Sequence, residues 1–214
     1  MKTAEHPLVS IITVNYNNTA VTCDMLRSLH NLSYDRIEVI VVDNASRLDP
    51  TSELKAAYPE VRVFVSDKNL GFAGGNNLGI KAAKGDFYFL VNNDTELTPG
   101  IIEPMLDIFR AHPDAGAASP KFHYYFHPGI IEYAGYEKVN FFTARNRMIG
   151  SRQKDEGQFN AVRETHYVHG GALMIPRKVV QIAGLMPEEY FLYYEELDWS
   201  EQIKRKGFRL YYQP

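Results

Sequence analysis

Two acidic groups that stand far apart in this sequence have the residue types for metal binding and proton transfer. The first is Asp94, in a polar turn at residues 92–96 that follows the apolar run 87–91. The second is a cluster of carboxylates at residues 195–198. An open α/β sheet commonly presents a metal or phosphate ligand at the carboxyl end of a strand. A metal ligand in the turn and a general base in the cluster is the simplest chemistry that uses both groups.

Asp94 suits a hard cation that holds a diphosphate. Mg²⁺ or Mn²⁺ typically accepts only one or two protein carboxylates and takes its other oxygens from phosphate and water. Asp94, with help from Glu96, matches that sparse coordination. The alternative is a turn aspartate that only hydrogen-bonds the backbone.

The carboxylate cluster consists of Glu195, Glu196 and Asp198, and the residues before it, 191–194, are aromatic or apolar. Apolar bulk beside a carboxylate raises its pKa, which suits a general base near neutral pH. The alternative is structural, because acids in the first turn of a helix interact favourably with the helix dipole.

Three further motifs have the composition of ligand-binding turns. Asp43 follows an apolar run and could accept a hydrogen bond from a nucleobase, or it could close an Asx-turn or a helix cap. The glycine-rich residues 71–77 would let the backbone approach a phosphate or ribose, or let a helix pack closely on a sheet. The N–H groups of Gly170 and Gly171 could seat an acceptor, and the adjacent His169 can be a loop residue without a role.

The elements that would position these residues alternate between strand and helix patterns in the first half of the chain. Strands without polar alternation, separated by helices, are typical of a mostly parallel sheet covered on both faces. Ligands of such sheets bind beyond the carboxyl ends of the strands. We expect strands at residues 8–14, 37–42, 61–65 and 86–91, and helices at residues 19–29, 52–58, 72–83 and 99–111.

The second half of the chain is less regular. Residues 117–163 are rich in aromatic residues and arginines without a clean period, and we expect a long excursion that is part sheet and part mobile loop. Beyond it we expect a tight turn and a strand within 168–175, a final strand at 208–212, and helices at 176–183 and 195–206. The chain stops directly after an apolar strand pattern, so we expect one domain, 1–214, that is truncated at its carboxyl end.

The composition narrows the classes of function. The chain has 214 residues and a net charge of -3, which predicts no nucleic-acid partner. Its single cysteine, Cys23, rules out an internal disulfide and fits a reducing compartment. The pattern contains no signal peptide and no transmembrane segment, so we expect a cytoplasmic protein.

Six motifs occur together in one order, and the ordered set resembles the inverting glycosyltransferases of family 2. The motif at 69–76 is similar to the rhamnosyltransferase-like branch that acts in polysaccharide assembly of the bacterial cell envelope. The resemblance implies the GT-A fold, a Rossmann-like, mostly parallel central sheet with flanking helices and a smaller acceptor-side region. The nucleotide-binding half would be about residues 1–115 and the acceptor-side half about 116–214. The motifs are residues 9–17, 41–46, 69–76, 90–94, 170–172 and 194–198.

The resemblance also implies roles for single residues. Asp94 would hold the divalent cation, Mg²⁺ or Mn²⁺, that bridges the diphosphate. Glu196 would be the catalytic base, and Glu195 stays open as an alternative base. Asn92 stands where the family usually has the first acid of its D-x-D motif. The donor nucleotide would be bound by Asn15, Asn17, Asp43, Gly74, Asn76, Asn92 and Asn93, and the acceptor by Gly170, Gly171 and Asp198.

The implied reaction is transfer of a sugar from a UDP-, dTDP- or GDP-sugar to a saccharide or lipid-linked acceptor. The implied place is the cytoplasm, at the inner face of the cytoplasmic membrane, with peripheral association through a missing carboxyl-terminal part. An alternative is a catalytically impaired nucleotide- or glycan-binding module of the same fold. A sugar nucleotidyltransferase would need a glycine-rich, basic loop after the first strand, and residues 15–18 are neither. A dehydrogenase would need its glycine fingerprint at that same place.

Overall fold

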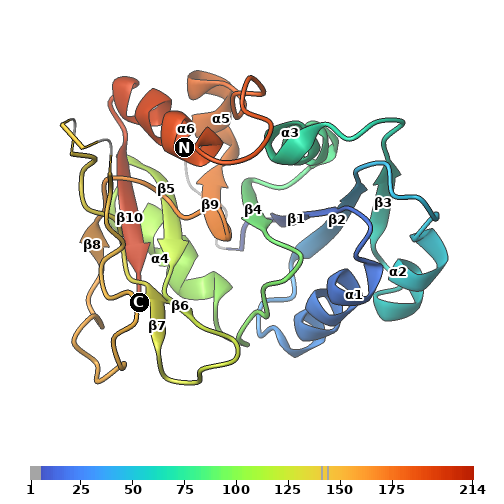
Figure 1. Ribbon diagram of the computed structural model, residues 1–214, viewed down its shortest axis with the longest axis horizontal. Helices are drawn as coiled ribbons and strands as arrows, with labels where there is room; N and C mark the ends of the chain where they lie inside the picture. The colour runs from blue at the N-terminus through green and yellow to red at the C-terminus, as the bar shows by residue number, and fades with distance from the viewer. Residues whose placement is uncertain (1–5, 141, 144) are drawn as a thin grey trace.

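The computed structural model describes residues 6–140, 142–143 and 145–214, and its centre is an eight-stranded sheet (Figure 1). The strands lie in the order β3-β2-β1-β4-β9-β5-β10-β8. Their bounds are β1 Val9–Asn15, β2 Ile37–Asp43, β3 Arg62–Val65, β4 Phe87–Val91, β5 Ala115–Pro120, β8 Arg163–Glu164, β9 Ala172–Pro176 and β10 Arg209–Gln213. The helices are α1 Thr19–Ser28, α2 Thr51–Ala57, α3 Gly71–Ala82, α4 Ile102–Ala111, α5 Arg177–Ala183 and α6 Glu195–Arg205, with a 3₁₀ turn at Leu29–Asn31.

The four strands of the first half pair in parallel, as their continuous apolar sequences predict. β1 and β2 are aligned from Val9 opposite Ile37 to Asn15 opposite Asp43. Because the two strands end level, their last polar residues lie side by side at the carboxyl edge of the sheet.

Helices cover both faces of the sheet. In Figure 1, α1, α2 and α4 lie below it and α3, α5 and α6 lie above it. The lower layer buries residues such as Leu26 and Met105, and the upper layer buries Trp199 and Ile203. Helix α3 sits very close to β1, since a Cβ added at Gly75 would lie 2.9 Å from Cγ1 of Val14, and one added at Gly79 would lie 2.4 Å from Cγ2 of Ile12. Gly75, at least, therefore serves helix–sheet packing within the glycine-rich motif.

The strand β5 corrects the expected excursion at residues 117–163. It is a fully buried strand in the middle of the sheet, parallel to β10. Its sequence, Ala-Gly-Ala-Ala-Ser-Pro, lacks the β-branched residues that mark strands. Small residues are needed there, because a Cβ on Gly116 would lie 2.5 Å from Cγ2 of Ile203 and 2.7 Å from Cβ of Phe208.

The strand β9 runs antiparallel to β4, with Ala172 opposite Val91. The end of β4 and the start of β9 consequently lie at the same edge of the sheet. The turn that carries Asp94 and the turn that carries Gly170 and Gly171 are thereby brought together.

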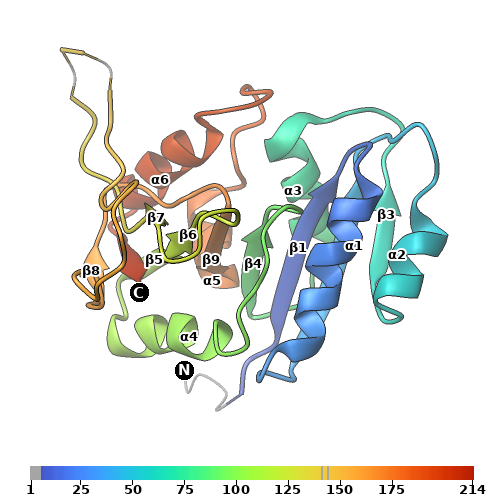
Figure 2. The ribbon, with the colours of Figure 1, turned by 60° about the horizontal axis from the view of Figure 1, so that its bottom comes forward.

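The remainder of the excursion stands apart from the main sheet. Strands β6 Phe122–His123 and β7 Ile131–Tyr133 form a separate antiparallel pair. A longer hairpin follows, with bridges from Tyr136 to Met148 and from Asn140 to Arg145, and its arms stand out from the molecule in Figure 2. Within the described residues, none of the helices combines the length and the apolar character that crossing a bilayer requires.

Candidate active site

A chain of buried hydrogen bonds connects the carboxyl ends of β4, β1 and β2. The Asn93 amide donates to Oγ1 of Thr22 at 2.9 Å, and this hydroxyl donates to Oδ1 of Asn15 at 2.7 Å. The Asn15 amide in turn donates to Oδ1 of Asp43 at 2.7 Å. The donor-side residues Asn15, Asp43 and Asn93 are therefore brought together as expected, although Asn15 and Asp43 are themselves buried.

Asp43 organises the turn after β2. Its Oδ2 accepts the Ser46 backbone N–H at 3.0 Å, and its Oδ1 also accepts the Ser46 hydroxyl. A contact to a nucleobase would use the remaining lone pair on Oδ2. Asn17, in the left-handed region with φ of 53°, donates its N–H to Ser46. A hollow of about 440 Å³ opens beside this turn, lined by Asn17, Thr19, Ser46, Arg47 and Leu48.

The glycine-rich motif is joined to the same edge through Asn44. The Asn44 amide donates to the Gly71 carbonyl at 3.0 Å, and its oxygen accepts the Leu70 N–H. Asn76 is buried inside α3, where its amide donates to the Phe72 carbonyl one turn earlier. Gly74 faces Leu70, whose Cβ would lie 2.7 Å from an added Cβ. The donor contacts expected of Gly74 and Asn76 stay predictions.

The backbone of the Asp94 turn is held by hydrogen bonds, while the Asp94 side chain is exposed. The Asn92 N–H donates to the Gly171 carbonyl at 2.8 Å, and the Thr95 N–H closes the turn onto the Asn92 carbonyl. Asp94 is exposed, and within the described residues no hydrogen bond or ion pair engages its carboxylate. The residues that the structure describes contain no group of three or more His, Cys, Asp or Glu side chains that could hold a metal ion. A cation at Asp94 would thus depend on ligand oxygens, which matches the sparse coordination typical of Mg²⁺ or Mn²⁺.

Glu196 lies against the glycine pair. A Cβ added at Gly170 would be 3.7 Å from Cδ of Glu196, which is van der Waals contact, so the carboxylate lies directly beside the glycine backbone. Helix α6 is held in this position by Ser200, whose hydroxyl donates to the Glu196 carbonyl and accepts the Val168 N–H. The acceptor-side pair Gly170 and Gly171 and the expected base are therefore neighbours.

The other two acids of the cluster point to different surroundings. Glu195 is buried, and its Oε2 has no hydrogen-bond partner among the described residues. Asp198 lies beside Tyr190, whose pKa it raises by its charge. Burial raises the pKa of both Glu195 and Glu196, the direction expected from the sequence. The apolar residues 191–194, from which the shift was expected, are themselves exposed and do not provide this burial.

Glu132, on β7, is a site residue that the sequence interpretation missed. Its pKa is raised by burial and then by the charge of Asp94. Tyr136 responds in turn to Glu196 and Glu132, since after burial their charges are the largest causes that raise the pKa of its hydroxyl. The directions of these shifts agree with the backbone contact between the Asp94 turn and the glycine pair that Glu196 lies against. The only signal in the sequence was the alternation apolar–acid–apolar at residues 131–133.

His169 has a structural role in the same place. Its Nδ1 accepts the Gly171 N–H at 3.0 Å, and its ring packs among Phe122, Tyr133 and Tyr136. Burial lowers the pKa of the imidazole to about 4, so the ring is neutral near pH 7. His169 consequently shapes the glycine turn rather than exchanging protons.

This architecture is that of a nucleotide-sugar transferase fold with an acidic site at the edge of its sheet. The family model described as Glycosyl transferase family 2 matches residues 10–181, so the chain belongs to that family. The resemblance seen in the motifs is confirmed.

Relatives of known sequence agree in class. The Low-salt glycan biosynthesis hexosyltransferase Agl10 of Haloferax volcanii is 24% identical over 211 residues, covering 94% of this chain and 63% of the relative. The N-acetylglucosaminyl-diphospho-decaprenol L-rhamnosyltransferase of Mycobacterium tuberculosis is 23% identical, covering 97% and 74%. The uncharacterized glycosyltransferase YwdF of Bacillus subtilis is 35% identical over 99 residues, covering 45% and 36%. The chain thus spans less than two thirds of the length of several relatives.

Solved structures confirm the fold. The mannosyltransferase PcManGT from Pyrobaculum calidifontis, in complex with GDP-Man and Mn²⁺, superposes with a TM-score of 0.67 at 18% identity, covering 99% of this chain and 55% of that one. The S. aureus protein TarS gives a TM-score of 0.67 at 16% identity, covering 96% and 36%. The GT-A fold predicted from the sequence is therefore correct.

Proposed function

We propose that this chain transfers a hexose or deoxyhexose from a nucleotide-diphospho-sugar to a saccharide or lipid-linked acceptor, with inversion, in cell-surface polysaccharide synthesis. The donor would be a UDP-, dTDP- or GDP-sugar. The reaction would take place in the cytoplasm, at the inner face of the membrane. Family membership supports the reaction class, and the named relatives support a glycan or lipid-linked acceptor.

The observation that carries the proposal is that the Asp94 turn and Glu196 both contact the glycine pair, although they come from opposite halves of the chain. The Asn92 N–H donates to the Gly171 carbonyl at 2.8 Å, and Cδ of Glu196 lies 3.7 Å from the position of a Cβ at Gly170. A donor diphosphate at Asp94 and an acceptor hydroxyl at Glu196 would then meet across one site.

Glu196 is the better candidate for the base. Its carboxylate lies against the Gly170 backbone, while Glu195 is buried. Glu196 would take the proton of the acceptor hydroxyl as that oxygen attacks the anomeric carbon from the face opposite the diphosphate. The bond from the anomeric carbon to the diphosphate oxygen breaks, and its electron pair leaves with the nucleoside diphosphate. A divalent cation at Asp94 would neutralise the charge that develops on this leaving group.

Titration calorimetry with UDP, GDP and dTDP, each with and without Mn²⁺, tests the donor side. At least one nucleotide should bind only when Mn²⁺ is present, and Asp94→Ala should abolish this binding. Glu196→Gln should leave it intact, because that residue serves the acceptor. Asp107→Ala, which removes an exposed acid of α4, is the matched control and should also leave it intact.

Two results would contradict the proposal. If a nucleotide bound equally with and without Mn²⁺, or equally to the Asp94→Ala variant, the metal role of Asp94 would be wrong. If nucleotide bound as expected but the chain within its full-length protein transferred no sugar from any of these donors, the binding-module alternative would replace the enzyme.

A further inference from the structure

An aromatic hollow lies outside the site described above, on the turn that joins β6 to β7. Its volume is about 480 Å³, which falls within the range of about 300–1,000 Å³ usual for ligand pockets. Tyr125 and Phe126 are 67% and 84% exposed, although aromatic rings of this size are normally covered. Their rings meet edge to face, with centroids 5.1 Å apart. The lining residues are Tyr124, Tyr125, Phe126, His127, Ile130 and Arg152.

The two walls of this hollow are fixed to each other by the backbone. The Arg152 N–H donates to the Ile131 carbonyl, and the Ile131 N–H donates to the Gln153 carbonyl, both at 2.8 Å. The Asp155 N–H donates to the Gly129 carbonyl at the same distance. Arg152 is held with φ of 64°, a left-handed conformation that costs a non-glycine residue about 1 kcal/mol. A strained arginine held by paired backbone on both sides forms a preformed wall.

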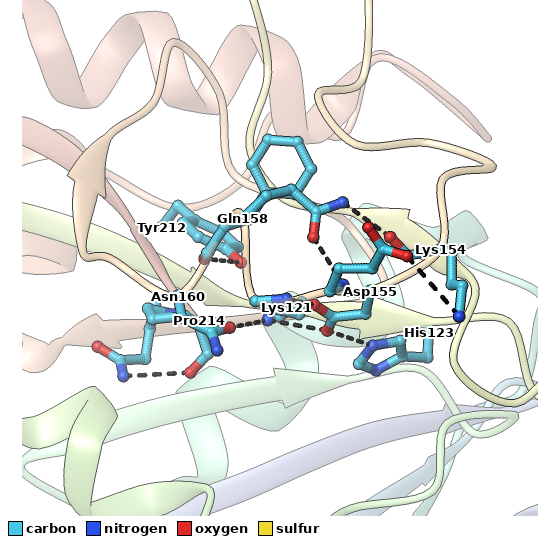
Figure 3. A network of polar contacts seen from close by, with 12 residues as sticks. Lys121, His123, Lys154, Asp155, Gln158, Asn160, Tyr212 and Pro214 are labelled. Atoms are coloured by element: carbon cyan, nitrogen blue, oxygen red, sulfur yellow. Dashed lines mark hydrogen bonds and ion pairs between the residues drawn. The ribbon is translucent and has the colours of Figure 1, made fainter.

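Side chains reinforce the same contact, as Figure 3 shows. Asp155 accepts the Lys121 ammonium at 3.0 Å and contacts His123 at 2.8 Å. The hydrogen bond from Lys121 is the largest cause that lowers the pKa of Asp155 to about 2. The segment that carries Arg152 is therefore tied to β6 as well as to β7, so the hollow exists without a ligand. Preorganisation of this kind reduces the cost of binding.

The hollow adjoins the strand that carries Glu132. Ile130, which lines the hollow, directly precedes β7, and Glu132 follows two residues later, a span of about 7 Å in extended backbone. The pairing of β6 with β7 shifts register at this point, and Glu132 is half-buried while Ile131 and Tyr133 are buried in a separate cluster. A ligand that extends over this short span could therefore occupy the hollow and the active site together.

The lining chemistry favours a sugar ring. Exposed aromatic faces stack on the apolar C–H face of a pyranose, while the guanidinium of Arg152 and the imidazole of His127 offer donors to its hydroxyls. Within the described residues, the lining includes no carboxylate, so neutral and anionic saccharides are both admitted. We propose that this hollow is a saccharide subsite that holds the part of the acceptor glycan remote from the reacting hydroxyl. Its assignment to an acceptor rests on the proposed function, but its affinity for sugar does not.

Saturation-transfer NMR without donor or metal tests the subsite. The probes are the methyl glycosides of glucose, galactose, mannose, rhamnose and N-acetylglucosamine, and their disaccharides, at millimolar concentration. At least one probe should receive saturation from the native chain, mainly on one C–H face. The double substitution Tyr125→Ala with Phe126→Ala should weaken its binding roughly tenfold or more, because both stacking rings are removed. Phe142→Ala, which removes an exposed aromatic of the neighbouring hairpin, should have no effect.

Arg152→Gly separates ligand contact from folding. Glycine accepts the left-handed backbone, so this variant should stay folded yet weaken binding about three- to tenfold. The subsite is refuted if no probe binds the native chain, or if the double variant binds as tightly as native. If the native chain binds nucleotide but none of the sugar probes, the subsite alone is refuted. If the native chain binds a sugar probe but no nucleotide, the sugar site is supported and the transferase is refuted.

Discussion

The two halves of the carboxyl edge satisfy their polar groups in opposite ways. On the nucleotide side, Asn15, Thr22 and Asp43 are buried and linked by hydrogen bonds. Around the glycine pair, Glu132 and Glu196 are partly buried, and burial raises the pKa of both, with no cation of the described residues among the causes. The nucleotide side of the proposed site is thus fixed by paired polar groups. The carboxylates around the glycine pair instead take up protons more readily than exposed ones, which suits the base of the proposed reaction.

The substitution Glu196→Gln has the largest expected effect, and this effect is on the transfer rate. Loss of a general base should lower the transfer rate of the full-length protein by ~10²–10⁴-fold. Initial rates measure this, and calorimetry should show unchanged donor affinity. Glu201→Gln, also on α6 but paired with Lys204, is the matched control and should keep its rate. An unchanged rate in Glu196→Gln, with a loss in Glu195→Gln, would move the role of base to Glu195.

Urea unfolding at a series of pH values measures what the neutral His169 ring at the glycine turn contributes to stability. His169 has a folded-state pKa of about 4, below its ordinary 6.5, so the unfolded chain binds more protons between these values. The contribution of the neutral ring is full above pH 6.5 and is lost as the pH falls toward 4. Its size is on the order of 3 kcal/mol.

The raised pKa values of Glu132, Glu195 and Glu196 act in the opposite direction, because they favour the folded state as the pH falls. Comparison with His169→Asn isolates the histidine. The variant should lose less stability between pH 6.5 and pH 4 than the native chain does. Equal losses in the two proteins would show that the imidazole is accessible to protons when folded.

The substitution Thr22→Val interrupts the hydrogen-bond chain that connects β4, β1 and β2. Valine has the same shape but no hydroxyl, so it leaves the Asn15 oxygen and the Asn93 amide without this partner. The free energy of unfolding should fall by about 1–3 kcal/mol, measured by urea denaturation. Thr22→Ser keeps the hydroxyl and should recover most of that loss. A valine variant as stable as native would mean that the hydrogen-bond chain adds nothing to the fold.

Asp155→Asn has the smallest expected effect, because asparagine keeps oxygen and nitrogen atoms that can hydrogen-bond and only the charge is lost. It should lower the free energy of unfolding by about 1 kcal/mol. The native contribution should disappear as the pH falls from 3.8 to about 2, because the folded-state pKa is depressed. Melting temperatures of both proteins across that pH range measure this. If the melting temperatures of the two proteins changed in parallel with pH, the ion pair would not contribute to stability.

The sequence predicts the first half of this fold well because two signals coincide there. Each buried strand is apolar and β-branched, and each ends in a polar turn, so Asn15, Asp43 and Asp94 could be placed at one edge. The strand β5 could not be predicted, because alanines and a glycine were chosen by the bulk of Ile203 and Phe208. Glu132 escaped for a related reason, since a three-residue strand is too short for its alternation to stand out.

The register between β4 and β9 also sets the spacing of residues beyond the ends of these strands. Val91 faces Ala172, and just beyond them the Asn92 N–H reaches the Gly171 carbonyl. A slip of one residue would exchange the side chains that β9 sends into the two hydrophobic layers. It would also change the separation between Asp94 and Glu196. One strand register therefore sets both the packing of the core and the spacing of the two carboxylates to which the proposal assigns the reaction, so an error in one would also alter the other.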